Sequence, residues 1–375
     1  MSNAKTKRAE IFFRHPRVLG TCVFCIFTLI AWVGVVRLAD ASRVKWSWLL
    51  NTSGTTSPAI ADTVPDAPAI VAQYRLLDGM SATGTQAADW PAAVMIENLP
   101  SVRPQSGLGD AMVVYEALAE GGATRFMALF DPQISAAEKI GPVRSSRPYY
   151  IEWLGEYDAL YAHAGGSPKA LLVIWEARVK NVEALGPDGK YFWRDHSIAA
   201  PHNLFTSAAE LRLALQTKGW LAMKASFLPW TFVDDATVDQ RGEDGKSAEF
   251  NFSTGKSYLV RWQYQRPTNS YLRYNAGVPH IDNNTGKQLE AKNVVVQLVD
   301  PPELDGTGKG RLDIYVGGTG KAWVFNNGNA IEATWKKLSR TDRTRFYDSA
   351  GHEIPMVRGA TWVHVVPKAQ AVTYR

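Results

Sequence analysis

MVVYEAL at residues 112–118 and TRFMALF at residues 124–130 flank a short segment that contains Gly121 and Gly122. Apolar runs rich in Val, Tyr and Phe are typical of strands, and two glycines between such runs permit a tight reversal of the chain. The pattern predicts a β-hairpin. AAVMI at residues 92–96 predicts a short buried strand beside it. The fold is therefore expected to be built on a β-sheet.

Helices are predicted downstream of this hairpin, at residues 149–157, 168–179 and 207–217, with Ser167 and Ser207 as N-caps for the second and third. Beyond them, the pattern is almost wholly that of strands separated by Gly, Asn and Asp turns. We thus predict an α+β fold, with a mixed α/β domain followed by a mostly antiparallel β domain that forms a small barrel or sandwich. The predicted later strands are 258–264, 271–274, 293–299, 311–316, 321–325, 331–335 and 361–366.

The N-terminal part of the sequence has the pattern of a membrane anchor. Five basic residues lie within residues 1–17, and nothing charged occurs from Val18 through Val36. An apolar run near 20 residues is long enough to span a bilayer, and flanking positive charge favours the cytoplasmic side. We therefore predict a cytoplasmic tail at 1–17, one transmembrane helix at 18–38 in the cytoplasmic (inner) membrane, and an extracytoplasmic remainder. That remainder is divided into a flexible linker at 39–70, an α/β domain at 71–225 and a β-rich domain at 226–375.

Cysteine content limits the chemistry of the external part. Cys22 and Cys25 are the two cysteines of the chain, and both lie in the predicted membrane helix. Disulfides and thiolate sites are thus excluded outside the membrane. Lipidation of Cys22 is an alternative form of anchoring, although the preceding Leu19-Gly20-Thr21 is a poor cleavage context. The net charge of +5 partly reflects the basic tail, and no nucleic-acid-binding motif is present.

Short polar motifs interrupt or end the apolar runs, and their positions suggest a site on a β scaffold. In the first domain they are VMIEN (94–98), RPQSGL (103–108), YE (115–116), EGG (120–122), TRF (124–126), GPVRSSRP (141–148), HAGGS (163–167) and APHNL (200–204). In the second domain they are YLR (271–273), Asp282, NVVVQ (293–297) and Trp335. Together these motifs resemble the YerB-like family of bacterial extracytoplasmic proteins. The resemblance implies two domains and a lipid or membrane-helix anchor, and that family has no established function.

Two glutamates are candidates for acid–base chemistry. Glu116 and Glu120 are four residues apart, which would put them on one side of the chain in either a helix or a strand. With Glu97 nearby, they could supply a proton donor and a base, as paired carboxylates do in glycoside hydrolysis. The alternative is structural: Glu120 pairs with Arg125 and Glu116 pairs with another arginine.

Arginines form a second candidate group. They are Arg103, Arg125, Arg144 and Arg147, and three of them lie beside Pro, Gly or Ser, where a guanidinium and backbone donors could together hold a phosphate or carboxylate. Pairing of these arginines with the glutamates is the alternative.

Histidines complete the candidate site. His163 precedes Gly165 and Gly166 at an expected helix start, where backbone N–H groups could hold an oxyanion. Ser167 is better explained as an N-cap than as a nucleophile. The grouping of Asp195, His196 and His202 with His163 has no recognised metal-ligand spacing, so we expect no metal site and no cofactor.

The sequence supports three hypotheses. The first is a hydrolase or transferase that acts on peptidoglycan or a related anionic glycan, the second is a non-catalytic envelope-binding or assembly module, and the third is a purely structural polar network. Aromatic residues with polar neighbours at 262, 264, 271, 273, 280 and 282 suggest either a carbohydrate platform or, more commonly, core packing. The candidate catalytic residues are Glu116, Glu120, His163 and His202. The candidate binding residues are Asn98, Arg103, Gln105, Ser106, Arg125, Arg144, Ser145, Arg147, Ser167, Asp195 and Asn203.

Overall fold

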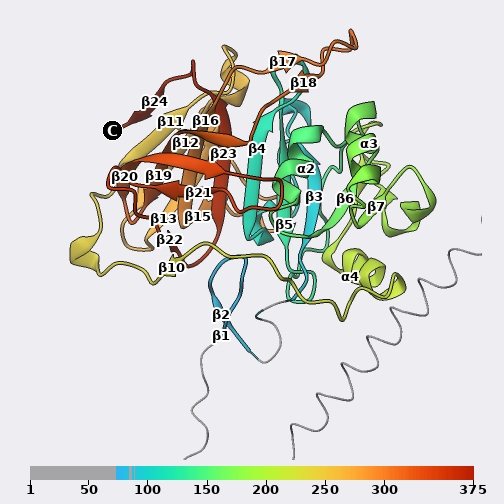
Figure 1. Cartoon of the computed structure of the whole chain (residues 1–375), viewed down its shortest axis with the longest axis horizontal. Coiled ribbons are helices and arrows are strands. Elements are labelled where there is room, and N and C mark those ends of the chain that lie inside the picture. Colours follow the sequence, from blue (N-terminus) through green and yellow to red (C-terminus); the bar gives the residue numbers. More distant parts are fainter. Residues whose placement is uncertain (1–72, 84–86, 88) are drawn as a thin grey trace, which may run out of the picture. The chain divides into compact units, whose positions relative to one another are not determined.

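The computed structural model describes residues 73–83, 87 and 89–375 (Figure 1). The predicted tail, membrane helix and linker, residues 1–70, lie outside these residues. Within the described part, none of the helices is both long enough and apolar enough to cross a membrane.

A ten-stranded mixed sheet forms the framework, and its strands come from both ends of the described chain (Figure 1). It joins strands of the predicted hairpin to strands more than 200 residues later in the sequence. In spatial order the strands are β21 (Arg345–Tyr347), β20 (Asn329–Lys337), β19 (Gly318–Asn326), β16 (Asn293–Val299), β23 (Thr361–Pro367), β4 (Val113–Leu118), β5 (Thr124–Phe130), β3 (Ala92–Glu97), β6 (Leu160–His163) and β7 (Asn181–Glu183).

The seam between the two halves of the chain is a parallel pair of strands. β23 pairs with β4 from Thr361 opposite Val113 to Val365 opposite Ala117. β23 also pairs in parallel with β16 on its other side. The sequence pattern predicted each of these strands but not the pairing, which makes the two halves parts of one sheet.

Among the described residues of the N-terminal half, three segments form α-helices: α2 (Pro148–Leu154), α3 (Pro168–Glu176) and α4 (Ala208–Thr217). The predicted N-caps are confirmed, since the Ser167 hydroxyl accepts a bond from the Ala170 N–H and the Ser207 hydroxyl accepts one from Glu210. α2 packs on one face of the large sheet, where Trp153 stacks on Tyr115 of β4 with ring centroids 5.2 Å apart.

A second sheet, wholly antiparallel, covers the opposite face of the large sheet. Successive strand residues point to opposite faces, so Tyr115 points to α2 while Glu116 points to this second sheet. Its strand β12 brings Trp262 against Trp362 of β23, with ring centroids 5.3 Å apart. The strands are β11 (Ser247–Phe250), β12 (Val260–Gln265), β13 (Ser270–Asn275), β14 (Val278–Pro279), β15 (Glu290–Ala291) and β24 (Val372–Tyr374).

Short strand pairs and 3-10 turns complete the described chain. The pairs are β1 (Gln73–Tyr74) with β2 (Ser81–Ala82), β8 (Trp193–Arg194) with β9 (Leu204–Phe205), β10 (Phe232–Val233) with β22 (Met356–Val357), and β17 (Glu303–Leu304) with β18 (Leu312–Asp313). The turns are η3 (Pro100–Val102), η4 (Leu108–Asp110), η5 (Glu120–Gly122), η6 (Pro187–Tyr191), η7 (Val238–Gln240) and η8 (Lys256–Tyr258).

The mixed α/β character of the N-terminal part and an antiparallel sheet in the C-terminal part are confirmed. The strand predicted at 311–316 is reduced to two residues, Leu312–Asp313. Trp262, Tyr264, Tyr271 and Arg273 are fully buried, and His280 and Asp282 nearly so. The carbohydrate interpretation of this group is therefore wrong, and the alternative of core packing is correct.

The shared sheet predicts cooperative unfolding of both halves. In urea, the part of the chain that follows residue 70 should lose far-ultraviolet circular dichroism and tryptophan fluorescence at the same midpoint, because neither half completes the sheet alone. Two separated transitions would show that the halves are independently stable.

Candidate functional site

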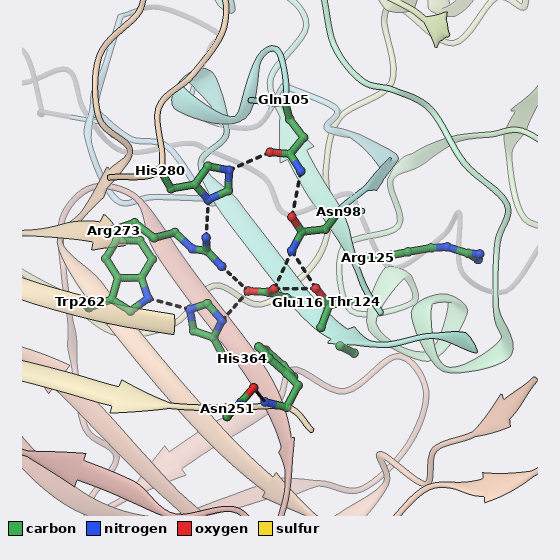
Figure 2. Close-up of polar contacts among 12 residues, drawn as sticks. Asn98, Gln105, Glu116, Thr124, Arg125, Asn251, Trp262, Arg273, His280 and His364 are labelled. Carbon is green, nitrogen blue, oxygen red and sulfur yellow. Dashed lines mark hydrogen bonds and ion pairs between the residues drawn. The ribbon is translucent and has the colours of Figure 1, made fainter. Parts of the chain in front are cut away.

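Glu116 of β4 lies at the centre of a buried polar network between the two sheets (Figure 2). Its Oε1 accepts hydrogen bonds from Asn98 Nδ2 at 3.1 Å and Thr124 Oγ1 at 2.7 Å. Its Oε2 accepts bonds from an Arg273 terminal nitrogen at 2.6 Å and from His364 Nδ1 at 3.0 Å. Burial alone would raise the pKa of Glu116, but Arg273, His364 and Thr124 together lower it to about 2. The carboxylate is thus ionised at physiological pH.

The tautomer of His364 follows from its two neighbours. The Trp262 indole N–H donates to His364 Nε2 at 2.9 Å, and an indole nitrogen can only donate. The proton of the imidazole must then sit on Nδ1, from which it reaches Glu116. Burial lowers the pKa of His364 despite the adjacent carboxylate. A second proton would have to displace the Trp262 bond, so the ring is held neutral.

His280 is held neutral in the opposite tautomer. Its Nδ1 faces a terminal nitrogen of Arg273, which can only donate, and its Nε2 donates to Gln105 Oε1 at 2.7 Å. Burial and the Arg273 charge hold the pKa of His280 well below its usual value. Gln105 in turn donates to Asn98 Oδ1 at 2.9 Å. The bonds therefore lead from Glu116 through Arg273, His280 and Gln105 to Asn98, which bonds Glu116 again.

We call this set the inner network: Asn98, Gln105, Glu116, Thr124, Trp262, Arg273, His280 and His364. Arg103 joins it at the rim, donating from Nε to Asn98 Oδ1 at 2.9 Å and from another nitrogen to the Ser257 carbonyl at 2.8 Å. Ser106 lies next to it, accepting from Asn283 Nδ2 at 3.3 Å. The arrangement matches the structural ion-pair alternative for Glu116, with Arg273 as the partner.

A second polar group lies on the other face of the sheet. Arg125 is opposite Glu97 on β3 and opposite Ala117 on β4, whereas Glu116 is opposite Phe126. Alternation along β5 therefore puts Arg125 and Glu116 on opposite faces, and Figure 2 shows Arg125 apart from the bonded residues. Glu120 belongs with Arg125, because β4 ends at Leu118 and the chain turns through η5. Glu116 and Glu120 consequently do not form a pair.

Glu120 is held between two arginines. Its Oε2 pairs with Arg125 at 3.0 Å, and its Oε1 pairs with Arg147 Nε at 2.5 Å. Arg125 also donates to the Ser145 carbonyl at 2.9 Å. Burial would raise the pKa of Glu120, but the bond from Arg147 and the two positive charges lower it. This carboxylate stays ionised, which suits a structural or binding role better than that of a proton donor.

Glu97 organises the adjoining part of this face. Its Oε1 lies 3.0 Å from Arg144 Nε and its Oε2 lies 2.8 Å from His202 Nδ1. The Glu97 side chain is buried, whereas about a quarter of each partner is exposed, 22% for Arg144 and 28% for His202. We call the combined set the arginine edge: Glu97, Glu120, Arg125, Arg144, Arg147 and His202.

The other predicted residues are distributed around this edge. His163 is buried, with Nδ1 bonded to the Gly165 carbonyl at 2.9 Å, and burial lowers its pKa. Ser167 caps α3. Asp195 pairs with Lys139 at 2.6 Å, and this bond with that from Ser197 lowers its pKa. Asn203 accepts from Arg194 at 2.8 Å.

Sequence reasoning missed the C-terminal members of the inner network. Arg273 was assigned to a possible binding face, and His364 was read only as part of a strand. The available signal was a charged or titratable residue within an otherwise apolar strand pattern, as in TWVHVV (361–366), since such a residue needs a buried partner.

Four cavities of about 300 to 550 Å³ in the described residues are lined by segments outside both the inner network and the arginine edge. The inner network is buried, whereas the Arg144 and His202 side chains are 22% and 28% exposed, so the arginine edge is the more accessible of the two groups.

Comparisons with known proteins agree on one family. Residues 77–221 match the family "Protein of unknown function (DUF3048) N-terminal domain", and residues 248–363 match the corresponding C-terminal domain. The chain is 33% identical to "Putative lipoprotein YerB" of Bacillus subtilis (strain 168) over 291 residues, which is 76% of this chain and 83% of that protein. It is also similar to the crystal structure of YerB protein from Bacillus subtilis, with a TM-score of 0.71 and 31% identity, covering 80% of this chain and 99% of that one.

Loss of the Glu116 charge should strongly destabilise the protein. Glu116→Gln leaves the Arg273 charge buried without its counter-ion, so we expect the free energy of unfolding to fall by about 3–5 kcal/mol in urea titrations. Glu120→Gln is the matched control. It should lower the free energy of unfolding less, because the partners of Glu120 are closer to solvent. Equal effects of the two changes would contradict the central role of Glu116.

Stability should also fall in mild acid. The folded pKa values of His280 and His364 lie below the unfolded value. Their contribution to the free energy of unfolding is therefore complete above about pH 6.5 and is lost as the pH falls below that value. Each histidine can add a slope of up to about 1.4 kcal/mol per pH unit to the free energy of unfolding. Between pH 6.5 and 5, His280→Gln should have a shallower slope than wild type. His352→Gln, at an exposed position, should leave it unchanged, and an unaltered slope in His280→Gln would refute the assignment.

Proposed function

Because this chain belongs to the YerB-like family, which is built from the two DUF3048 domains, we propose that it is an extracytoplasmic envelope protein that binds an anionic polymer without cleaving it. The Bacillus subtilis relative is named "Putative lipoprotein YerB", and this name supports association with the membrane. For this chain, the uncharged apolar run at 18–36 supports a retained single-pass helix at 18–38 with the N-terminus inside.

The arginine edge is the observation that carries the proposal. Three guanidinium groups, those of Arg125, Arg144 and Arg147, converge on one end of the sheet against only two carboxylates. Arginine recognises carboxylate and phosphate through paired hydrogen bonds, and partly buried arginines lose little mobility on binding. Peptidoglycan and related envelope glycans present such acidic groups to a membrane-tethered protein.

The state of the predicted acid–base residues favours binding over catalysis. Glu116 is fully buried and ionised, and Glu120 is ionised between two arginines. A general acid needs a proton near the working pH and access to the substrate. Neither glutamate has both a proton near the working pH and access to a substrate. His163 is enclosed beside α3.

One contact supports the second candidate, a hydrolase or transferase. His202 Nδ1 lies 2.8 Å from a Glu97 carboxylate oxygen, and its ring is partly exposed. A histidine oriented by a buried carboxylate is an arrangement that general bases use. Arg144, on the same carboxylate, would then position an acidic group of the substrate.

Polymer binding should depend on the arginine edge. Full-length protein in detergent should sediment with purified sacculi, and Arg144→Ala/Arg147→Ala should weaken that binding at least about tenfold, since two direct anion contacts are lost. Lys309→Ala/Arg375→Ala removes the same charge from exposed positions elsewhere and serves as the control. Equal loss in both double variants would indicate only non-specific attraction.

Catalysis is tested on the same material by mass spectrometry of soluble products. We expect no release of fragments by wild type. Release that disappears in His202→Gln and Glu97→Gln, with sedimentation retained, would overturn the non-catalytic proposal in favour of the hydrolase.

A further inference from the structure

A groove opens in the C-terminal half where two neighbouring strands of the large sheet separate. β16 and β19 pair from Val294 opposite Phe325 to Gln297 opposite Ala322, and their pairing stops there. β19 nevertheless remains paired with β20 as far as Gly318 opposite Lys337. Residues 318–321 therefore line one wall of a cavity of about 550 Å³, with Leu298 and Val299 on the other side. This volume is in the range of small-ligand sites, roughly 300–1,000 Å³.

Trp335 of β20 fixes the shape of this groove. Its indole N–H donates to the Leu298 carbonyl at 2.9 Å, so the ring crosses behind β19 to reach β16. Gly320 makes the crossing possible, because a Cβ at that position would lie 2.6 Å from the indole nitrogen. The buried indole thus bridges from β20 to β16 across Gly320 and supplies an apolar wall of the cavity.

Tyr315 supplies an open aromatic surface at the same place. Its side chain is 74% exposed although it lines the cavity. Its ring lies against the backbone of Gly317 and Gly318, where added Cβ atoms would be 3.5 Å and 3.7 Å from the nearest ring carbons. The glycines support the ring without covering it. An exposed aromatic ring held in this way is suited to stacking against the apolar face of a sugar.

Charged groups surround the aromatic wall. Lys321 of β19 and Lys368, which directly follows β23, line the cavity. Lys368 pairs with Asp300 at the exposed rim. Flexible lysines at a rim can bond hydroxyl, acetamido or carboxylate oxygens. A flat aromatic surface ringed by donors favours a glycan over an apolar peptide, which would require deeper side-chain pockets.

We infer that this groove, lined by Leu298, Asp300, Tyr315, Lys321, Trp335 and Lys368, binds a short segment of a glycan chain, with one sugar ring stacked on Tyr315. The site is distinct from the arginine edge, which lies among strands of the N-terminal half. It therefore does not depend on the proposed anion binding, and a protein with both sites would hold a glycan polymer at two places.

The test uses full-length protein in detergent and the β-1,4-linked tetramer of N-acetylglucosamine as the probe, with saturation-transfer NMR and calorimetric titration. Wild type should bind the tetramer with saturation transfer to the sugar ring protons. Tyr315→Ala should weaken binding at least about tenfold, and Tyr315→Phe should remain within about threefold of wild type because the stacking surface is kept. Lys321→Ala should weaken binding less than Tyr315→Ala.

Two control variants separate this site from other surfaces. Trp175→Ala removes a 77% exposed aromatic ring from α3 and should leave tetramer binding unchanged. Arg144→Ala/Arg147→Ala should also retain tetramer binding. A result against polymer binding at the arginine edge can therefore be told apart from a result against glycan binding in the groove. No binding by wild type, equal binding by Tyr315→Ala, or Tyr315-dependent binding of a wall tetrapeptide in place of the sugar would overturn the inference.

Discussion

The ion pair between Glu116 and Arg273 is the interaction on which the rest of the described structure depends. The two residues come from different sheets, both are fully buried, and their charged atoms are 2.6 Å apart. Removing two charges from water costs several kcal/mol each, and attraction offsets this cost only when the remaining bonding capacity is satisfied. Asn98, Thr124, His364 and His280 supply most of those bonds, and Arg273 Nε is left without a hydrogen-bond partner among the described residues. The pair thereby constrains how β13 lies across β4, since a shift of one residue would leave a buried charge unpaired.

The large sheet separates polar residues that are close in sequence. Glu116 is opposite Phe126 and Arg125 is opposite Ala117 on the adjoining strands β4 and β5, so the two charged residues face different layers. Glu116 is enclosed by the second sheet, and Arg125 lies at an edge close to solvent. Buried polar residues with a structural role and more accessible polar residues therefore lie on opposite faces of the same sheet. The residues suited to a ligand are those on the α2 side, where arginines outnumber carboxylates. The residues on the inner side hold the two halves of the chain together.

The local features of the fold were accessible from the sequence, and the long-range ones were not. Alternating or continuous apolar runs predicted β3, β4, β5 and β16, and Ser167 and Ser207 correctly marked helix starts, because these signals reside within a few residues. The parallel pairing of β23 with β4 depends on contacts between distant segments, which no local period encodes. The spacing argument for Glu116 and Glu120 failed for a related reason: it assumes one regular element, and β4 ends at Leu118.

The position of β23 in the sheet has a consequence for biogenesis. Residues 119 to 360 separate β4 from this neighbour, so the hairpin of β4 and β5 is made long before the strand that covers its open edge. Pairings of such large sequence separation form slowly, and an uncovered strand edge invites pairing with other chains. A chain made in N-to-C order carries that edge uncovered until Thr361–Pro367 has been added. Folding of this protein therefore calls for either rapid completion of the chain or temporary protection of β4 by a holding factor.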